Sequence, residues 1–141
     1  MIDIDIALSP GGRVPTSGSK GAAGCDIYST TNIMIAPGET RRVSTGIHTQ
    51  IPTGYEAQIR GRSGLAMKGM MVALGTIDCD YRGEWGIIFH NSTKELYQIN
   101  IGDRIAQAVF NEVPRVNFNV VQDLDKTNRG INGFGSTGRG E

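Results

Sequence analysis

The sequence has few cysteines and no recognisable metal-binding spacing. Its two cysteines, Cys25 and Cys79, lie far apart in the chain, and with His48 and His90 they match no zinc pattern such as paired CxxC. Two reduced thiols are therefore expected, although the sequence alone leaves one disulfide open.

An excess of charge and a long apolar run are also missing. Fourteen Lys and Arg balance fourteen Asp and Glu, so no net field attracts the chain to nucleic acid or anionic lipid. No apolar run reaches bilayer-spanning length, and the start, MIDIDIALSP, lacks the cationic and apolar regions of a signal peptide. We therefore expect an intracellular, soluble, cytoplasmic protein that binds neither nucleic acid nor membranes.

The length of 141 residues predicts one domain with one core. From Asp123 to Glu141 the composition changes, because glycines dominate and Leu124, Ile131 and Phe134 are the only large apolar residues. So little apolar surface does not offset the entropy of ordering the segment in isolation. We therefore predict a domain over residues 1–122 and a mobile arm over residues 123–141.

Alternating apolar residues predict short strands rather than helices. The alternation is clearest at 2–6, 55–59 and 116–120, and further strand-like runs are 32–35, 42–48, 86–90 and 104–110. Turn signals containing Pro, Gly, Asn or Asp separate these runs, as is typical of an all-β fold. Only 63–70 favours a helix, and Gly64 and Gly69 limit it to one or two turns.

Two glycine-containing segments carry groups that strand packing does not require. The first, 21–26, ends in Asp26, which can face a cation through water or simply form a tight turn. The second, 60–66, offers arginines, a hydroxyl and the amides of a helix start, which suit a phosphate group. Its alternative interpretation is a helix N-cap at Ser63 beside surface arginines.

Three further segments follow. Residues 75–83 combine carboxylates, a phenol and an arginine, which indicates either a hairpin turn or a carboxylate base beside an aromatic ring. Residues 102–107 place an acid, an arginine and Gln107 at a turn and strand start. Residues 129–138 combine an arginine, hydroxyls, exposed amides and a phenyl ring, a plausible binding surface for a polyphosphate joined to an aromatic base.

In this order, the five segments closely resemble the five motifs of the trimeric deoxyuridine triphosphate nucleotidohydrolases, the dUTPases, from Gly21 to Gly138. The resemblance implies a distorted jelly-roll β-barrel with at most one short helix, and a homotrimer whose sites combine all three chains. It also implies Mg²⁺-dependent hydrolysis of dUTP to dUMP and pyrophosphate. That reaction keeps uracil out of DNA and supplies dUMP for thymidylate synthesis.

The same resemblance implies residue roles. Asp78 would orient and deprotonate the attacking water, Tyr81 would pack on the deoxyribose, and Asp26 would touch the water shell of a Mg²⁺ ion held mainly by the triphosphate. The other implied substrate-binding residues are Gly75, Ile77 and Gly86 at the uracil edge, Arg62, Ser63, Gly64 and Gln107 at the α- and β-phosphates, and, from the arm, Phe134 on uracil with Arg129, Gly135, Ser136 and Thr137 over the γ-phosphate.

The chain departs from the family pattern at Asn132, at Cys25 and at Ala73-Leu74, none of which has an implied chemical role. Trp85 is expected to turn its side chain away from the uracil pocket.

Three alternative functions remain: a dCTP deaminase-like enzyme of the same fold, a dUTPase that also binds an unknown regulatory protein, and a structural jelly-roll of the capsid type.

Overall fold

A computed structural model describes residues 1–133, which form short strands and one helical turn. In chain order the elements are β1 Asp5–Leu8, β2 Thr16–Ser17, β3 Cys25–Tyr28, β4 Ile33–Ile35, β5 Thr40–Ser44, β6 Ile47–Gln50, β7 Tyr55–Arg60, α1 Ser63–Ala66, β8 Met70–Val72, β9 Gly75–Ile77, β10 Gly86–Asn91, β11 Tyr97–Ile99 and β12 Arg104–Glu112. The all-β prediction is confirmed, as is the short helix.

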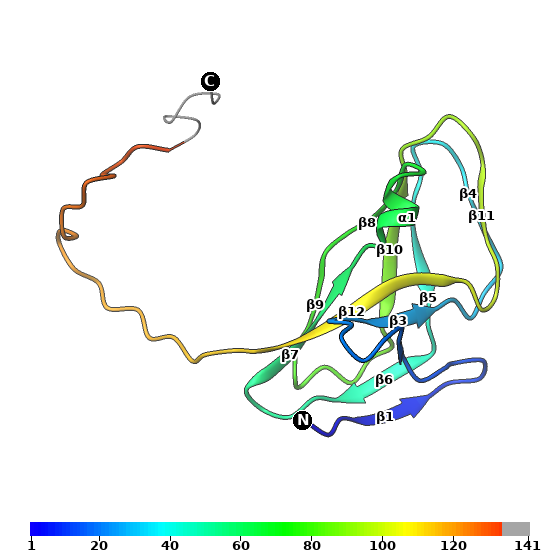
Figure 1. Ribbon diagram of the computed structural model, residues 1–141, viewed down its shortest axis with the longest axis horizontal. Helices are drawn as coiled ribbons and strands as arrows, with labels where there is room; N and C mark the ends of the chain where they lie inside the picture. Colours follow the sequence, from blue (N-terminus) through cyan, green and yellow to red (C-terminus); the bar gives the residue numbers. More distant parts are fainter. Residues whose placement is uncertain (134–141) are drawn as a thin grey trace.

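The strands pair antiparallel in four sheets (Figure 1). The largest has the order β2-β3-β12-β7-β9, a second has the order β5-β10-β8, and β1-β6 and β11-β4 form two-stranded ribbons. Within residues 1–133 these sheets do not close into one hydrogen-bonded barrel. The jelly-roll of this chain is therefore an open one.

The inward side chains of the two larger sheets form one buried cluster. Val43, Ile87 and Phe89 contribute from the three-stranded sheet, and Ile27 and Ile59 contribute from the five-stranded sheet. Each is at most 2% exposed, and burying a side chain of this size stabilises the fold by roughly 1.5–3 kcal/mol. The core thus lies between the sheets, and the polar segments lie at their edges.

Three sequence-based strand predictions need correction. The strand expected at 2–6 begins only at Asp5 and runs to Leu8 as β1. The run 42–48 is two strands, β5 and β6, because Gly46 turns the chain with a φ of 66°. A Cβ on Gly46 would lie 2.8 Å from the Cα of Gly12, so this turn requires glycine.

The predicted strand at 116–120 is absent from the described chain. Residues 113–133 contain neither strand nor helix and lead away from the sheets beyond β12 (Figure 1). Val116, Phe118 and Val120 are 71%, 88% and 100% exposed. Their alternation has no neighbouring strand to pair with in a single chain, and a strand needs such a partner for its backbone hydrogen bonds.

Both cysteines, Cys25 and Cys79, are free thiols. Among residues 1–133, no helix has the length and apolar character needed to cross a membrane.

Candidate active site

A carboxylate between two arginines lies on the five-stranded sheet, on β3 between β2 and β12. Asp26 on β3 accepts a hydrogen bond from Arg104 Nη1 through Oδ2 at 3.2 Å, and its Oδ1 forms an ion pair with Arg62 Nε, also at 3.2 Å. Arg62 also donates from Nη1 to the carbonyl of Arg104 at 3.0 Å. The Asp26 side chain is 17% exposed, so the two arginines cover most of the carboxylate and only a small part of it faces solvent. We call Asp26, Arg62 and Arg104 the arginine cluster.

Gln107 joins the arginine cluster through strand pairing. On β12 it lies opposite Asp26 of β3 and Arg60 of β7. Its Nε2 donates to the carbonyl of Gly61 at 3.1 Å, and a Cβ on Gly24 would lie 2.6 Å from its Oε1. Segments 21–26, 60–66 and 102–107 therefore converge, as expected for residues that bind one ligand.

The start of α1 adds hydrogen-bonding groups beside the arginine cluster. Arg62, not Ser63, is the N-cap, and no side chain caps the helix. The N-cap interpretation of Ser63 is therefore wrong, and within residues 1–133 its hydroxyl has no hydrogen-bond partner. A Cβ on Gly64 would meet nothing within 4 Å, so the backbone there is open to a ligand.

A pocket of about 290 Å³ lies between β9 and the start of β10. Its lining residues are Arg42, Ile59, Gly75, Thr76, Ile77, Asp78, Tyr81, Glu84 and Gly86. We call it the hairpin pocket. This lining includes the five residues to which the resemblance gives roles at the base, the sugar and the attacking water: Gly75, Ile77, Asp78, Tyr81 and Gly86.

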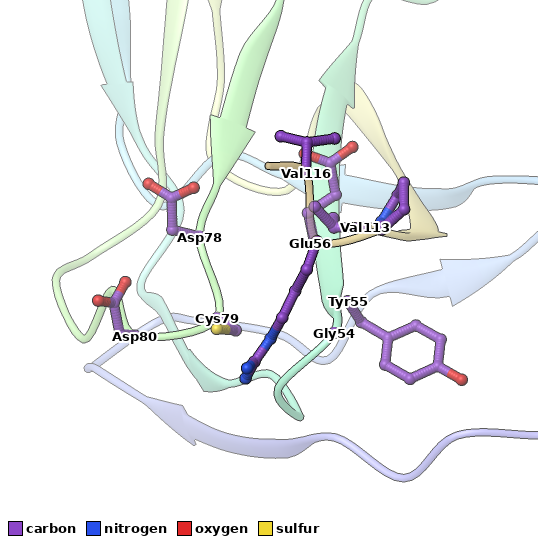
Figure 2. A pocket seen from close by; sticks show the side chains of 10 residues that line it. Gly54, Tyr55, Glu56, Asp78, Cys79, Asp80, Val113 and Val116 are labelled. Atoms are coloured by element: carbon purple, nitrogen blue, oxygen red, sulfur yellow. The ribbon is translucent and has the colours of Figure 1, made fainter. Parts of the chain in front are cut away.

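Asp78 also borders a second, wider hollow. That hollow of about 660 Å³ lies between the turn after β9 and the segment that follows β12. Figure 2 shows Asp78 and Asp80 on one side of it and Glu56, Val113 and Val116 on the other. Asp78 is exposed, so its carboxylate is accessible at the boundary between the hollow and the hairpin pocket.

Hydrogen bonds fix the loop that carries Asp78 and Tyr81. Arg82 donates from Nη1 to the carbonyls of Cys79 and Tyr81, at 2.8 and 3.1 Å. His48 Nδ1 lies 3.1 Å from the carbonyl of Arg82 and must therefore carry a proton. Tyr81 donates its hydroxyl to the carbonyl of Glu84 at 3.1 Å. The phenol ring is thus held at the pocket by a bond inside its own loop.

Glu84 ties this loop to the turn between β5 and β6. Its Oε1 accepts from the backbone N–H groups of Thr45 and Gly46, at 3.0 and 2.9 Å, and its Oε2 pairs with Arg42 at 3.2 Å. Partial burial acts to raise the pKa of Glu84, but the Gly46 N–H, the Arg42 guanidinium and the Thr45 N–H outweigh it. The net result is a pKa below the ordinary value.

The sequence-based reasoning missed Arg42 and Glu84. Neither lies in a segment with an unusual composition, and Arg42 enters the pocket only because β5 pairs with β10.

The prediction for Trp85 is confirmed: the indole is 1% exposed, packs near Phe110 with ring centroids 6.4 Å apart, and is not among the residues that line the hairpin pocket.

Strand β7 separates Asp78 from the arginine cluster. Ala57 pairs with Ile77, which puts Asp78 beside Glu56, whereas Gln107 pairs with Arg60. The four-residue step from Glu56 to Arg60 covers about 13 Å, because strand residues advance about 3.3 Å each. One chain therefore presents the two groups at opposite ends of the same strand.

Of the arm residues that the sequence implicates, Arg129 is described, and it lies near neither Asp78 nor the arginine cluster. Arg129 donates from Nε to the carbonyl of Asn132 at 3.0 Å, within the segment that leads away from the sheets. The predicted residues Phe134, Gly135, Ser136 and Thr137 lie outside the described residues.

The donors for a metal ion are sparse. Residues 1–133 contain no group of three or more His, Cys, Asp or Glu side chains that could hold one. Asp26 accepts one hydrogen bond, from Arg104, and pairs with Arg62 as an ion, so acceptor sites remain on its carboxylate, which has about four when ionised. A Mg²⁺ ion that arrives on substrate phosphates and keeps its waters fits these donors, whereas an all-protein site does not.

Comparison with known sequences agrees with this geometry. The dUTPase family model matches residues 11–138. The deoxyuridine 5'-triphosphate nucleotidohydrolase of Zymomonas mobilis is 46% identical over 143 residues, covering 97% of this chain and 98% of its own. The enzyme of the same name from vaccinia virus strain Copenhagen is 45% identical over 126 residues, covering 89% and 86%.

Solved structures agree as well. The dUTPase of Staphylococcus bacteriophage 80alpha with dUpNHpp superposes with a TM-score of 0.92 at 28% identity, covering 99% of this chain and 100% of that one. A variant dUTPase from phage phi11 of S. aureus, in which a structural Mg(II) ion is coordinated, has a TM-score of 0.81 at 27% identity and covers 86% and 98%.

Proposed function

Since the chain belongs to the dUTPase family, we propose that it is a dUTP diphosphatase, which hydrolyses dUTP to dUMP and pyrophosphate. The observation that carries this function is the hairpin pocket, where Asp78 and Tyr81 meet the backbone of Gly75, Ile77 and Gly86. A pocket with one accessible carboxylate, one ring and exposed backbone suits a nucleoside whose base is read by main-chain groups.

Asp78 is the general base in this proposal. It accepts a proton from the water that attacks the α-phosphorus, and pyrophosphate leaves from the opposite side. Its exposure at the pocket boundary supports this role, because the attacking water must reach it. Tyr81 packs on the deoxyribose, and its bond to the Glu84 carbonyl supports a fixed ring that leaves no room for a 2′-hydroxyl.

The α- and β-phosphates are bound by Arg62, Ser63, Gly64 and Gln107. Guanidinium groups form strong charge-assisted bonds to phosphate oxygens, and Ser63 has its hydroxyl available. A Mg²⁺ ion held mainly by the triphosphate would neutralise phosphate charge, and Asp26 would accept from its water shell through the acceptor sites that the arginines leave open. Arg129, Phe134, Gly135, Ser136 and Thr137 of the arm, residues 123–141, close over the γ-phosphate and uracil.

A complete site requires more than one chain, and we propose a homotrimer. The separation of about 13 Å along β7 supports this assembly, because Asp78 and the phosphate-binding residues must flank adjacent phosphates. The exposed Val116, Phe118 and Val120 support it too, because they alternate as in a half-buried strand and no surface within residues 1–133 buries them. The enzyme is proposed to work in the cytoplasm, with dUTP as partner and no nucleic acid or membrane.

A nucleotide panel tests the activity. Pyrophosphate release from dUTP, with little from dCTP, dTTP or UTP, is the expected result. Release of ammonia from dCTP would instead identify the deaminase alternative and overturn the proposal.

A further inference from the structure

Among the described residues, Arg42 supplies the one positively charged side chain in the lining of the hairpin pocket. It lies on β5, outside all five family-like segments, and its guanidinium packs directly against Gly86, where a Cβ would collide with Nε. Gly86 is one of the residues proposed to read the uracil edge. Only a residue without a side chain permits this approach, so Arg42 forms a wall of the pocket at its base-reading end.

The position of Arg42 is fixed by Glu84. Nη2 pairs with Oε2 of Glu84 at 3.2 Å and lies 3.3 Å from the Glu84 carbonyl, which also accepts from Tyr81. The carboxylate is itself held by two backbone N–H groups. The N–H groups of Thr45 and Gly46 and the hydroxyl of Tyr81 therefore fix the position of Glu84. The guanidinium that pairs with Glu84 is oriented as a result.

Part of the guanidinium is left for a ligand. Only Nη2 donates to a protein acceptor within residues 1–133, so Nε and Nη1 keep their N–H groups free. These groups can donate but not accept. The ligand atom that suits them is an oxygen acceptor, and a uracil ring offers two carbonyl oxygens.

We infer that Arg42 is a further substrate-binding residue, which donates a hydrogen bond to a carbonyl oxygen of the pyrimidine base. The inference rests on the proposed function and deepens it. Glu84 acts through Arg42 as a positioning residue. With a guanidinium at this end of the pocket, the base accepts a charge-assisted hydrogen bond, as the triphosphate does.

The test compares Arg42→Leu with Arg41→Leu. Arg41 is a close match, because it lies on the same strand, pairs with Glu39 at 2.9 Å and is 48% exposed, against 49% for Arg42. We expect Arg42→Leu to raise KM for dUTP by about ten- to hundredfold at nearly constant kcat, since a bond to a charged donor is lost in ground and transition states alike. Arg41→Leu should leave KM unchanged.

Deoxyuridine, which has the base and the sugar but no phosphates, shows whether Arg42 contributes to binding of the base or of the phosphates. Used as a competitive inhibitor, it should lose affinity for Arg42→Leu by the same factor as dUTP. Glu84→Gln, which keeps an acceptor oxygen for the backbone N–H groups, should give a smaller rise in KM, and thermal unfolding should show both variants folded.

Two results would overturn the inference: an unchanged KM for dUTP in Arg42→Leu, or a raised KM with an unchanged inhibition constant for deoxyuridine, which would assign Arg42 to the phosphates. Failure of the wild-type protein to hydrolyse dUTP would overturn the proposed function itself, before any variant is compared.

Discussion

Replacing Asp26 by Asn tests how the arginine cluster works. The substitution keeps the shape of the side chain but removes the charge that pairs with Arg62 and Arg104, both at 3.2 Å. The amide can still accept one hydrogen bond, and Arg62 keeps its bond to the carbonyl of Arg104. The variant should therefore fold and retain the outline of the site.

The expected loss of stability is small. The side chains of Arg62 and Arg104 are 31% and 53% exposed, so solvent screens both ion pairs. Each pair then contributes about 0.5 kcal/mol, and losing both lowers the free energy of unfolding by about 1 kcal/mol. For a chain of 141 residues this corresponds to a fall in Tm of about 3–4 °C.

The catalytic loss should be larger than the loss of stability. Arg62 without its partner is less well oriented toward phosphate, and Mg²⁺ loses a charged acceptor for its waters. We expect kcat/KM for dUTP to fall about tenfold or more, since small misplacements of binding groups are costly. The Mg²⁺ concentration for half-maximal rate should rise.

A matched control is Asp103→Asn. Asp103 is an exposed turn acid that accepts from the N–H of Asn100 at 2.8 Å and forms no ion pair with the described residues. Because Asn is also a good turn residue, this variant should keep its activity and its Mg²⁺ dependence. An Asp26→Asn enzyme with unchanged Mg²⁺ dependence would refute the metal role, and one with unchanged kcat/KM would refute both roles.

Four further predictions follow from the same geometry. Asp78→Asn should bind dUTP normally in a binding titration while kcat falls by orders of magnitude, and near-normal turnover would remove Asp78 as the base. Deleting residues 129–141 should leave the melting curve unchanged and lower kcat/KM sharply, whereas unfolding would assign the arm to the core. Phe118→Ser should weaken the trimer in light scattering, and an active wild-type monomer would contradict the shared site. Because the pKa of Glu84 is lowered from 4.5, its stabilisation is complete above that pH and is lost below it, so the stability difference between wild type and Glu84→Gln should shrink in acid-denaturation curves below pH 4.5.

Local patterns predicted the fold where one face of a strand is buried. Tyr55, Ala57 and Ile59 alternate in the sequence, and in β7 Ala57 and Ile59 are 0% and 2% exposed. The same pattern at Val116, Phe118 and Val120 has no partner strand within residues 1–133. Periodicity reports a face that can be buried, but it does not say whether the burying surface belongs to the same chain.

The site was predictable as residue types but not as a geometry. Segments 21–26, 60–66 and 102–107 meet because β12 pairs with β3 on one side and β7 on the other, a long-range register that spacing does not reveal. The position of Arg42 was also unpredictable, because it too depends on long-range strand pairing. An exposed strand arginine has no local signal, and its place beside Gly86 depends on the pairing of β5 with β10.

The stable part of the molecule and its reactive part are separated by the sheets themselves. The buried cluster consists of inward side chains such as Val43, Ile59 and Phe89. Asp26 on β3 and Asp78 after β9 lie outside that cluster, as do the guanidinium groups. These groups contribute little to the core, so a single chain can fold while its two partial sites remain about 13 Å apart along β7. In the proposed trimer, assembly and not folding brings the base and the phosphate-binding groups together, so activity should depend on protein concentration wherever the trimer dissociates.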